Sequence, residues 1–314
     1  MKLGIDAMGG DFAPGVAVTG SALASLELPS EAIIYLIGDE PVLKQLLAKQ
    51  EKYDASKIVI VHAPQVIEMG DHPAKAFQHK PNSSIAVGFG MLQQGKIDVF
   101  ASAGNTGAMM VGTMYTVKAI PGVIRPCISA PIAKIDSPNP GVLLDVGLNA
   151  DCKPDVLYQY AVLGSIFSNA LYGIDNPRVA LLNIGEEEEK GNLLTKATFE
   201  LMKGTKEFNF IGNIESNKLF WDNADVIVCD GFTGNIILKQ SETLHTISKD
   251  LGVEHEYFEH YNYENHGGTV ILGVNKPVII AHGMSNHTAI KNMILQSMRI
   301  VKSELTEKIK QAFL

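Results

Sequence analysis

The residues that could do chemistry in this chain stand in short glycine-containing segments. Asn105 and Thr106 lie between two glycines in "SAGNTGA", and Lys190 follows four consecutive glutamates in "NIGEEEEKGN". Asn and Thr can cap a following helix, and the same exposed backbone N–H groups can bind an anion. A cation beside such a turn can hold a phosphate or a developing oxyanion, whereas the glutamates are typical of a solvated helix N-terminus. These residues alone leave both interpretations open.

Two further segments place polar residues after an apolar run. "CDGFTGNIILK" presents Asp230, Thr233 and Asn235, and "VIIAHGMS" reaches His282 just before a glycine. A lone histidine is more often structural than catalytic, but its place after a strand raises the catalytic interpretation to equal weight. Together these segments indicate an anion-binding site with few strong general bases. Such a site suits phosphoryl or acyl transfer better than hydride transfer.

The segment "DAMGGD", residues 6–11, follows the first short apolar run and raises the same question. Two adjacent glycines between two aspartates are typical of a tight turn. A backbone without side chains at these positions can also approach a ligand closely. The segment alone favours the turn.

Apolar runs alternate with helix-like stretches between these segments. Strands are expected at Ala32–Ile37, Ile58–Val61, Ile97–Ala101, Val142–Val146, Val179–Ile184, Val226–Val228 and Val278–Ile280. Helices are expected at Asp39–Gln50, Ser83–Gln94, Pro154–Ala170, Leu193–Met202 and Asn235–Lys249, with a long amphipathic stretch at Asn286–Phe313. Continuous apolar runs predict strands buried on both faces of a parallel sheet, and the alternation predicts βαβ units. The glycine-containing segments then lie at the carboxyl ends of strands, where ligands bind in such sheets.

Composition narrows the class of protein. The chain has 314 residues, 46% of them hydrophobic, which is enough for one large α/β domain or two lobes. Its net charge of -8 argues against general nucleic-acid binding. The three cysteines show no CxxC spacing and are expected to be reduced core thiols of a cytoplasmic protein. No signal peptide or membrane-spanning run is expected, although contact with a membrane surface stays open.

Three familiar motifs fail on inspection. "GMLQQGKI" lacks the Ser or Thr of a phosphate-binding P-loop and has a helix before it, so Gly95 is expected to end that helix. "HEYFEH" separates its histidines by five residues, which would not share one helix face, and no metal site is expected. The run Glu186–Glu189 is better explained as a solvated turn than as a magnesium site. Neither GxGxxG in a nucleotide-binding context nor GxSxG is present.

The chain resembles the PlsX family of bacterial acyl-[acyl-carrier-protein]:phosphate acyltransferases. The matching stretches are "DAMGGDFAP", "SAGNTGAMM", "RPCISAPI", "LLDVGLNADCKP", "RVALLNIGEEEEKGN", "NFIGNIES", "DVIVCDGFTGNIILK" and "KPVIIAHG", in order along almost the whole chain. More remotely, "GVNKPVIIAHG" is similar to a segment of phosphate acetyltransferases whose Ser-Arg pair lies at the active site. Ala281 and His282 occupy that place here, so the role of the serine does not carry over.

The resemblance implies transfer of a fatty acyl group from acyl-[acyl-carrier-protein] to inorganic phosphate, giving an acyl phosphate for phospholipid (phosphatidic acid) synthesis. It implies an α/β, two-lobed, isocitrate/isopropylmalate dehydrogenase-like (phosphate acetyltransferase-like) fold with Rossmann-like parallel sheets around a cleft. The lobes are expected at 1–118 with 266–314, and at 119–265, with the active site between them. A homodimer is expected, with no cofactor or metal. A local basic patch is expected to dock the acidic carrier protein.

The glycine-containing loops and the lone cation then suggest roles for their residues in this reaction. His282, Lys190 and Asn105 are expected to be catalytic: backbone N–H groups of Asn105–Gly107 and Lys190 would hold phosphate, and His282 would stabilise the oxyanion or protonate the leaving thiolate. Gly9 and Gly10 would let the backbone approach the substrate, while Asp6 and Asp11 would hold their loop. The expected phosphate- and substrate-binding residues are Asp6, Gly9, Gly10, Thr106, Gly107, Asp145, Asn149, Asp230, Thr233, Gly234, Asn235 and Gly283.

One departure and three alternatives remain. The segment between Glu242 and Gly267 is shorter and more polar than the helical hairpin of the family, which leaves open peripheral attachment to the inner membrane face or contact with a downstream membrane acyltransferase. The alternatives are a phosphate acyltransferase that uses acyl-CoA, an NAD(P)-dependent decarboxylating dehydrogenase on the same fold, and a non-enzymatic scaffold for lipid synthesis.

Overall fold

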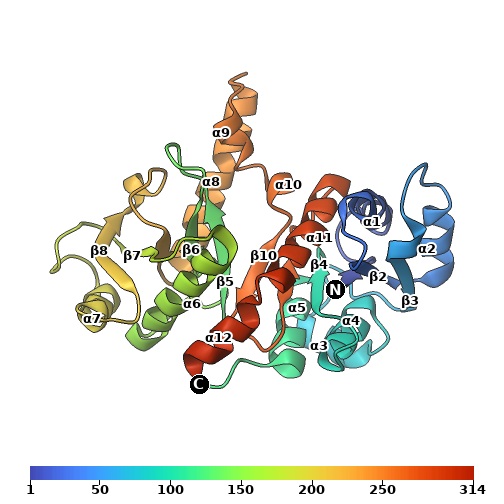
Figure 1. Cartoon of the computed structure of the whole chain (residues 1–314), viewed down its shortest axis with the longest axis horizontal. Coiled ribbons are helices and arrows are strands. Elements are labelled where there is room, and N and C mark those ends of the chain that lie inside the picture. The colour runs from blue at the N-terminus through green and yellow to red at the C-terminus, as the bar shows by residue number, and fades with distance from the viewer. The chain divides into compact units, whose positions relative to one another are not determined.

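The computed structural model describes the backbone of residues 1–314 and all side chains except those of Tyr263 and His266. The chain forms two compact units (Figure 1). The first unit comprises Met1–Lys118, Tyr263–Val270 and Val274–Lys302, and the second comprises Ala119–Asn262, Ile271–Gly273 and Ser303–Leu314. The last dozen residues therefore lie with the second unit, whereas the sequence analysis placed them with the first.

The first unit is built on a mainly parallel sheet with strand order β3-β2-β1-β4-β11-β10. Only the β10–β11 pair within it is antiparallel among the described strands. Its strands are β1 (Lys2–Asp6), β2 (Ile33–Gly38), β3 (Ile58–His62), β4 (Val99–Ser102), β10 (Thr269–Leu272, whose last two residues belong to the second unit) and β11 (Val278–Ile280). Its helices are α1 (Gly15–Glu27), α2 (Glu40–Leu47), α3 (Pro73–His79), α4 (Ser84–Gln93), α5 (Thr106–Gly112), α10 (Tyr263–His266) and α11 (His287–Lys302).

Helices cover both faces of this sheet. Helices α1 and α11 pack on each other on one side, and α4 packs with α5 on the other (Figure 1). The middle strands β1 and β4 are apolar along most of their length, and Leu3, Ile5 and Phe100 are fully buried. Each such side chain contributes roughly 1.5–3 kcal/mol by leaving water. The continuous apolar runs predicted from the sequence are therefore explained by burial on both faces.

In the second unit the strands stand in the order β5-β6-β9-β7-β8. Its described pairs are parallel except β5–β6. Its strands are β5 (Cys127–Ile132), β6 (Gly141–Leu144), β7 (Arg178–Asn183), β8 (Asn209–Glu215) and β9 (Val226–Val228). Its helices are α6 (Pro154–Tyr172), α7 (Leu193–Met202), α8 (Gly231–Asp250), α9 (Glu256–Glu259) and α12 (Leu305–Phe313).

The structure corrects the expectation of one long closing helix at residues 286–313. Two helices occupy this stretch, and the backbone turns between them at Glu304, which has φ of 55°. Helix α11 packs on α1, whereas α12 buries Leu305 and Ile309 and packs on α6. The two helices pack on different partners, α11 within the first unit and α12 within the second. This turn also explains why the last residues join the second unit.

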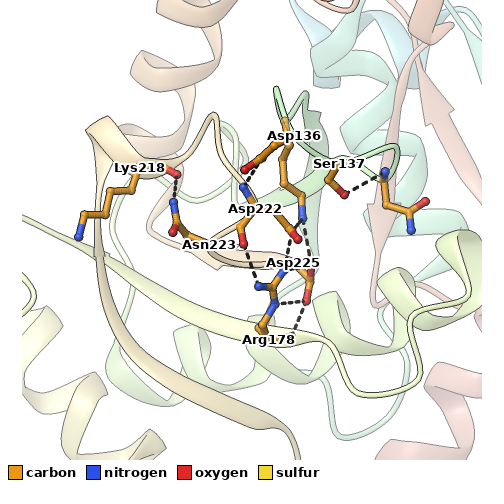
Figure 2. A network of polar contacts seen from close by, with 9 residues as sticks. Asp136, Ser137, Arg178, Lys218, Asp222, Asn223 and Asp225 are labelled. Carbon is orange, nitrogen blue, oxygen red and sulfur yellow. Dashed lines mark hydrogen bonds and ion pairs between the residues drawn. The ribbon is translucent and has the colours of Figure 1, made fainter.

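An ion-pair network ties together the amino ends of β7 and β9 (Figure 2). Arg178 begins β7 and donates through Nε and Nη2 to both carboxylate oxygens of Asp225, each at 2.9 Å. The buried Lys134 donates to Asp225 at 3.0 Å and to Asp222 at 2.7 Å. Burial alone raises the pKa of Asp225, but the hydrogen bonds from Arg178 and Lys134 outweigh it and hold that pKa well below its ordinary value. The network thus lies at the opposite strand ends from the candidate functional loops.

Candidate functional site

Three loops of the first unit are joined at the carboxyl ends of the neighbouring strands β1, β4 and β11. Ser102, the last residue of β4, donates from Oγ to Oδ2 of Asp6 at 2.6 Å and accepts the backbone N–H of Gly104 at 2.9 Å. Asp6, the last residue of β1, also accepts the N–H of Met8 at 3.0 Å. The N–H of Asp11 donates to the carbonyl oxygen of Gly283 at 2.8 Å, after the end of β11. Adjacent strands thus gather segments that are far apart in the sequence.

Asp6 acts as the buried centre of this arrangement. Asp6 is 1% exposed. Burial raises the pKa of its carboxyl group, whereas hydrogen bonds from Ser102, Ser84, Met8 and Gly9 lower that pKa. A buried carboxylate remains tolerable only while such donors surround it. These contacts hold the loop around Asp6, and its expected part in binding substrate stays a prediction.

Gly9 and Gly10 have a packing reason for lacking side chains. A Cβ at Gly9 would lie 2.3 Å from Oδ2 of Asp6 and 2.7 Å from the backbone of Gly104. Gly10 has φ of 104°, and a Cβ there would lie 3.1 Å from the carbonyl oxygen of Gly283. The glycines therefore allow the first loop to lie directly against the other two. The need for glycine at positions 9 and 10 thus arises from packing between the loops and does not depend on a ligand. The sequence analysis did not predict this packing.

Asn105 joins a fourth segment to these loops. Its Oδ1 caps α5 by accepting the N–H of Ala108 at 2.9 Å. Its Nδ2 donates to the carbonyl oxygens of Glu68, Met69 and Asp71 at 3.0–3.2 Å. Both polar atoms of the side chain are engaged, and the residue is 5% exposed. A direct catalytic role would therefore have to rest on its backbone N–H.

The first backbone N–H groups of α5 are the open donors of this loop. Those of Asn105, Thr106 and Gly107 have no acceptor in the described part of the chain. Thr106 is exposed, whereas a Cβ at Gly107 would lie 2.3 Å from Cγ of Pro73. Gly107 thus lets α5 approach α3, and the available donors are at the start of α5.

His282 lies two residues beyond the end of β11, with an exposed side chain. Its Nδ1 accepts the backbone N–H of Met284 at 3.2 Å. A ring nitrogen that accepts a hydrogen bond carries no proton, so the neutral imidazole has its proton on Nε2. This hydrogen bond therefore favours the tautomer with the proton on Nε2. In this form the side chain offers an Nε2–H donor.

In the second unit, Asp145 and Asn149 hold their own loop together after β6. Asp145 is fully buried and accepts the N–H groups of Ile128 at 3.0 Å and Asn149 at 2.7 Å. The Asn149 amide donates to the Tyr160 hydroxyl and the Pro126 carbonyl oxygen, both at 2.8 Å. Burial raises the pKa of the Asp145 carboxyl group, despite these hydrogen bonds. These contacts make Asp145 and Asn149 organisers of the loop.

The start of α8 packs directly on that loop. Asp230 caps the helix by accepting the N–H of Thr233 at 2.8 Å and its hydroxyl at 3.0 Å. A Cβ at Gly234 would lie 1.9 Å from the carbonyl oxygen of Asp145. Asn235 donates from Nδ2 to the carbonyl oxygen of Val146 at 3.1 Å. The residues expected to bind substrate here make the first turn of α8 fit against the loop after β6.

Lys190 lies in an exposed turn between β7 and α7. Its backbone N–H donates to the carbonyl oxygen of Glu187 at 3.1 Å, and its carbonyl oxygen accepts from Asn183 at 3.1 Å. Two neighbouring glutamates form ion pairs with other lysines, Glu186 with Lys218 and Glu188 with Lys203. The Nζ of Lys190 has no ion-pair partner among the residues that the structure describes. The turn thus presents a lysine without a direct ion pair, next to Glu187 and Glu189, which also form no ion pair among the described residues.

The structure also bears on a metal site, on a membrane-spanning helix and on one residue that the sequence analysis did not name. Within the described residues, no group of three or more His, Cys, Asp or Glu side chains is placed to hold a metal ion. In the same part of the chain, no helix combines the length and apolar character needed to cross a bilayer. Ser102 was not predicted as a site residue, although its place at a strand end within "SAGNTGA" was a usable signal.

The fold is that of the phosphotransacetylases. The chain matches EutD phosphotransacetylase from Staphylococcus aureus with a TM-score of 0.65 and 18% identity, covering 96% of this chain and 94% of that one. A phosphotransacetylase from Streptococcus pyogenes gives a TM-score of 0.67 at 16% identity, with the same coverage. A 4-hydroxythreonine-4-phosphate dehydrogenase from Klebsiella pneumoniae gives 0.59 at 13% identity, covering 96% and 98%. This agrees with the two-lobed dehydrogenase-like and phosphate acetyltransferase-like fold predicted from the sequence.

Sequence comparison then defines the family. Residues 1–255 and 247–308 match the family described as "Fatty acid synthesis protein". The phosphate acyltransferase of Dictyoglomus turgidum is 40% identical over 98% of this chain and 96% of its own length, and that of Aquifex aeolicus is 39% identical over 98% and 96%. The chain belongs to the phosphate acyltransferase family, the PlsX family. It is accordingly a transferase that moves an acyl group to phosphate.

Proposed function

We propose that this protein transfers a fatty acyl group from acyl-[acyl-carrier-protein] to inorganic phosphate, and that the acyl phosphate formed serves phospholipid synthesis. Family membership supports the acyl transfer to phosphate. The carrier-protein donor and the lipid pathway follow from the resemblance of the loops. The observation that carries the proposal is the junction of the loops after β1, β4 and β11. Ser102 joins Asp6 to the loop that leads into α5, and the N–H of Asp11 donates to Gly283, the residue after His282.

In the proposed reaction, an oxygen of phosphate dianion attacks the carbonyl carbon of the thioester. The C–O bond forms, and the carbonyl electrons move to oxygen to give a tetrahedral oxyanion. When the oxyanion collapses, the C–S bond breaks and the thiolate leaves as the thiol after it gains a proton. Phosphate is already a nucleophile, so positioning and charge stabilisation are the main contributions required of the protein.

Phosphate is proposed to bind at the backbone N–H groups of Asn105, Thr106 and Gly107, with Lys190 as the cation. Phosphate binding at these N–H groups is supported by their lack of an acceptor in the described part of the chain. The role of Lys190 is supported by its Nζ, which has no ion-pair partner among the described residues. These groups belong to the first and second unit respectively. That one reaction uses both units, in an active-site cleft between lobes, stays a prediction.

His282 is proposed to donate from Nε2 to the oxyanion or to the leaving sulfur. The hydrogen bond from Met284 to Nδ1 supports this role, because it leaves the proton of the neutral ring on Nε2. A donor that stabilises an oxyanion typically contributes about 10²–10³ in rate. The Ser-Arg pair of the distant relatives has no serine counterpart here, so no nucleophilic side chain is invoked.

The test is formation of acyl phosphate by the purified protein, trapped as the hydroxamate with hydroxylamine. We expect product from phosphate and acyl-carrier-protein thioester, and less from the matching acyl-CoA. A preference for acyl-CoA would replace the proposed donor. A divalent metal and NAD(P) requirement would instead support the dehydrogenase alternative, and failure with both thioesters would support a scaffold.

Two variants separate the proposed roles. Lys190→Ala should raise the KM for phosphate, whereas Lys196→Ala, an exposed lysine on α7, should leave it unchanged. His282→Ala should lower kcat about 10²–10³-fold. His282→Gln keeps a donor but cannot act as an acid, so partial recovery would identify hydrogen-bond donation and no recovery would identify proton transfer. Full activity of His282→Ala would contradict both roles.

Homodimer formation, docking of the carrier protein on a basic patch, and peripheral membrane contact are proposals as well. Sedimentation of the purified protein tests the dimer. The effect of charge reversal at single surface lysines on the KM for the carrier protein tests the patch. Flotation with anionic lipid vesicles tests membrane contact.

A further inference from the structure

An open pocket of about 700 Å³ lies in the second unit. Its walls come from the segments that follow β6, β7 and β9, three neighbouring strands of that sheet. The apolar side chains of the wall are Cys152, Leu193, Leu194 and Phe232. The carboxyl ends of parallel strands are where ligands bind in such sheets, and the volume lies in the range of small-molecule sites.

Two of these apolar side chains are unusually exposed for their size. Leu193, the first residue of α7, is 90% exposed, and Phe232, the second residue of α8, is 64% exposed. Gly231 and Gly234 lie three apart on the face of α8 that packs against the loop after β6, so Phe232 points away from that contact. Large apolar side chains that converge on one open pocket mark a binding surface.

The charges around the pocket exclude an anionic occupant. The wall contains two carboxylates, Asp151 and Asp230, and none of its described residues is Lys, Arg or His. Phosphate or a nucleotide would be repelled by these carboxylates and would find no cation there. A neutral hydrocarbon chain has no such penalty and gains from contact with Leu193, Leu194 and Phe232.

We propose that this pocket receives the hydrocarbon chain of the acyl donor, and that Leu193 and Phe232 determine which chain lengths are used. The proposal rests on the fatty acyl transfer proposed above. Three observations favour a hydrocarbon chain over a charged ligand. The chain belongs to a phosphate acyltransferase family, the wall has several large apolar side chains, and none of its described residues is a cation. Leu194 and Cys152 line the same pocket.

Binding and turnover test the pocket separately. The methyl ester of cis-parinaric acid, a fluorescent and uncharged long-chain probe, is titrated into wild type, Leu193→Ser, Phe232→Ser and Leu194→Trp. Each substitution should weaken binding about 10- to 100-fold, since each removes apolar contact or fills the pocket. The matched control is Leu251→Ser, which alters a 73% exposed leucine beyond the end of α8 and should bind like wild type.

A second experiment measures the kinetics of acyl phosphate formation with hexadecanoyl and butanoyl donors. The ratio of kcat/KM for the long and the short donor should fall at least about 10-fold in Leu193→Ser and Phe232→Ser, and stay at the wild-type value in Leu251→Ser. Because Leu193 and Phe232 are exposed, their variants should keep the wild-type Tm, which separates lost binding from lost folding.

The outcomes distinguish the pocket from the reaction. If wild type forms no acyl phosphate from either donor, the proposed function fails, and the methyl parinarate titration still decides the pocket. Unchanged methyl parinarate binding and an unchanged donor ratio in all three pocket variants would overturn the proposal. It would also be overturned if Leu193→Ser abolished self-association in sedimentation without altering methyl parinarate binding, because the pocket would then receive a second copy of the chain.

Discussion

The hydroxyl group of Ser102 donates to Oδ2 of Asp6 over 2.6 Å and joins the carboxyl end of β4 to that of β1. Both residues are buried, and the same hydroxyl oxygen accepts the N–H of Gly104. One side chain therefore sets the distance between two loops of the candidate site. The loops expected to bind phosphate depend on this internal contact for their shape.

Replacing Ser102 by Ala should impair stability and activity together. Asp6 would lose a donor in a buried position, at a cost of about 1–3 kcal/mol in the free energy of unfolding. We expect kcat/KM for acyl phosphate formation to fall by more than 10-fold. Ser297→Ala is the matched control, because that buried serine donates to the Met293 carbonyl oxygen within α11. Ser297→Ala should lower the free energy of unfolding and keep the wild-type kcat/KM. Equal kcat/KM values for the two variants would contradict a role of Ser102 in the candidate site.

Gly9→Ala should disrupt the contact between the loops. The new Cβ would meet Oδ2 of Asp6 at 2.3 Å and the Gly104 backbone at 2.7 Å, so at least one loop must move. We expect a kcat/KM loss of about 10²-fold, because a displacement of about 1 Å at a reacting group has an effect of that order. Gly90→Ala, in α4 with no atom near the new Cβ, should retain activity. Crystallography of Gly9→Ala would show the displaced loop, and an unmoved loop with full activity would contradict this account.

Asp225→Asn should destabilise the second unit in a pH-dependent manner. The pKa of Asp225 lies below its ordinary value of 3.8, so the stabilisation by its ion pairs is fully present above that value and is lost as the pH falls toward the lower folded pKa. Breaking such a buried pair costs about 3–5 kcal/mol at neutral pH. Urea unfolding at neutral pH and below pH ~4 should show a large difference from wild type that shrinks on acidification.

The matched control for Asp225 is Asp250→Asn at the exposed end of α8, which should change stability by less than about 0.5 kcal/mol. If Asp225→Asn lost the same stability at both pH values, the cause would be packing, and the charge assignment for the network in Figure 2 would be wrong.

The Cys152 thiol should react slowly at neutral pH. Burial raises its pKa to about 11, and the nearby carboxylates of Asp145 and Asp230 add to this effect. Since the thiolate is the reactive form, alkylation by iodoacetamide should accelerate as the pH approaches that value. Asp230→Asn keeps a capping side chain but removes one charge, so it should increase the rate at a given pH. Mass spectrometry of the labelled cysteine gives the rates; rapid labelling of wild type at neutral pH would contradict the raised pKa.

Much of the architecture could be predicted from the chain itself. Helix α7 and strands β9 and β11 have the expected bounds, and Gly95 follows the end of α4 with φ of 68°. Strands β5 and β8 were not expected. Pro131 interrupts the first, and polar residues alternate with apolar ones in the second, so neither reads as a continuous apolar run.

The sequence by itself determined where the candidate loops stand. Buried strands need continuous apolar runs, and the polar and glycine residues after each run must lie at the carboxyl ends. Only the tertiary structure decided which polar side chains form their hydrogen bonds within the protein. The Asn105 amide donates to carbonyl oxygens of residues 68, 69 and 71, and the Asp145 carboxylate accepts from residue 128 as well as from its near neighbours 148 and 149. A buried polar group must be satisfied by the groups that the fold brings beside it, and the partners at residues 68, 69, 71 and 128 come from segments that local spacing could not identify.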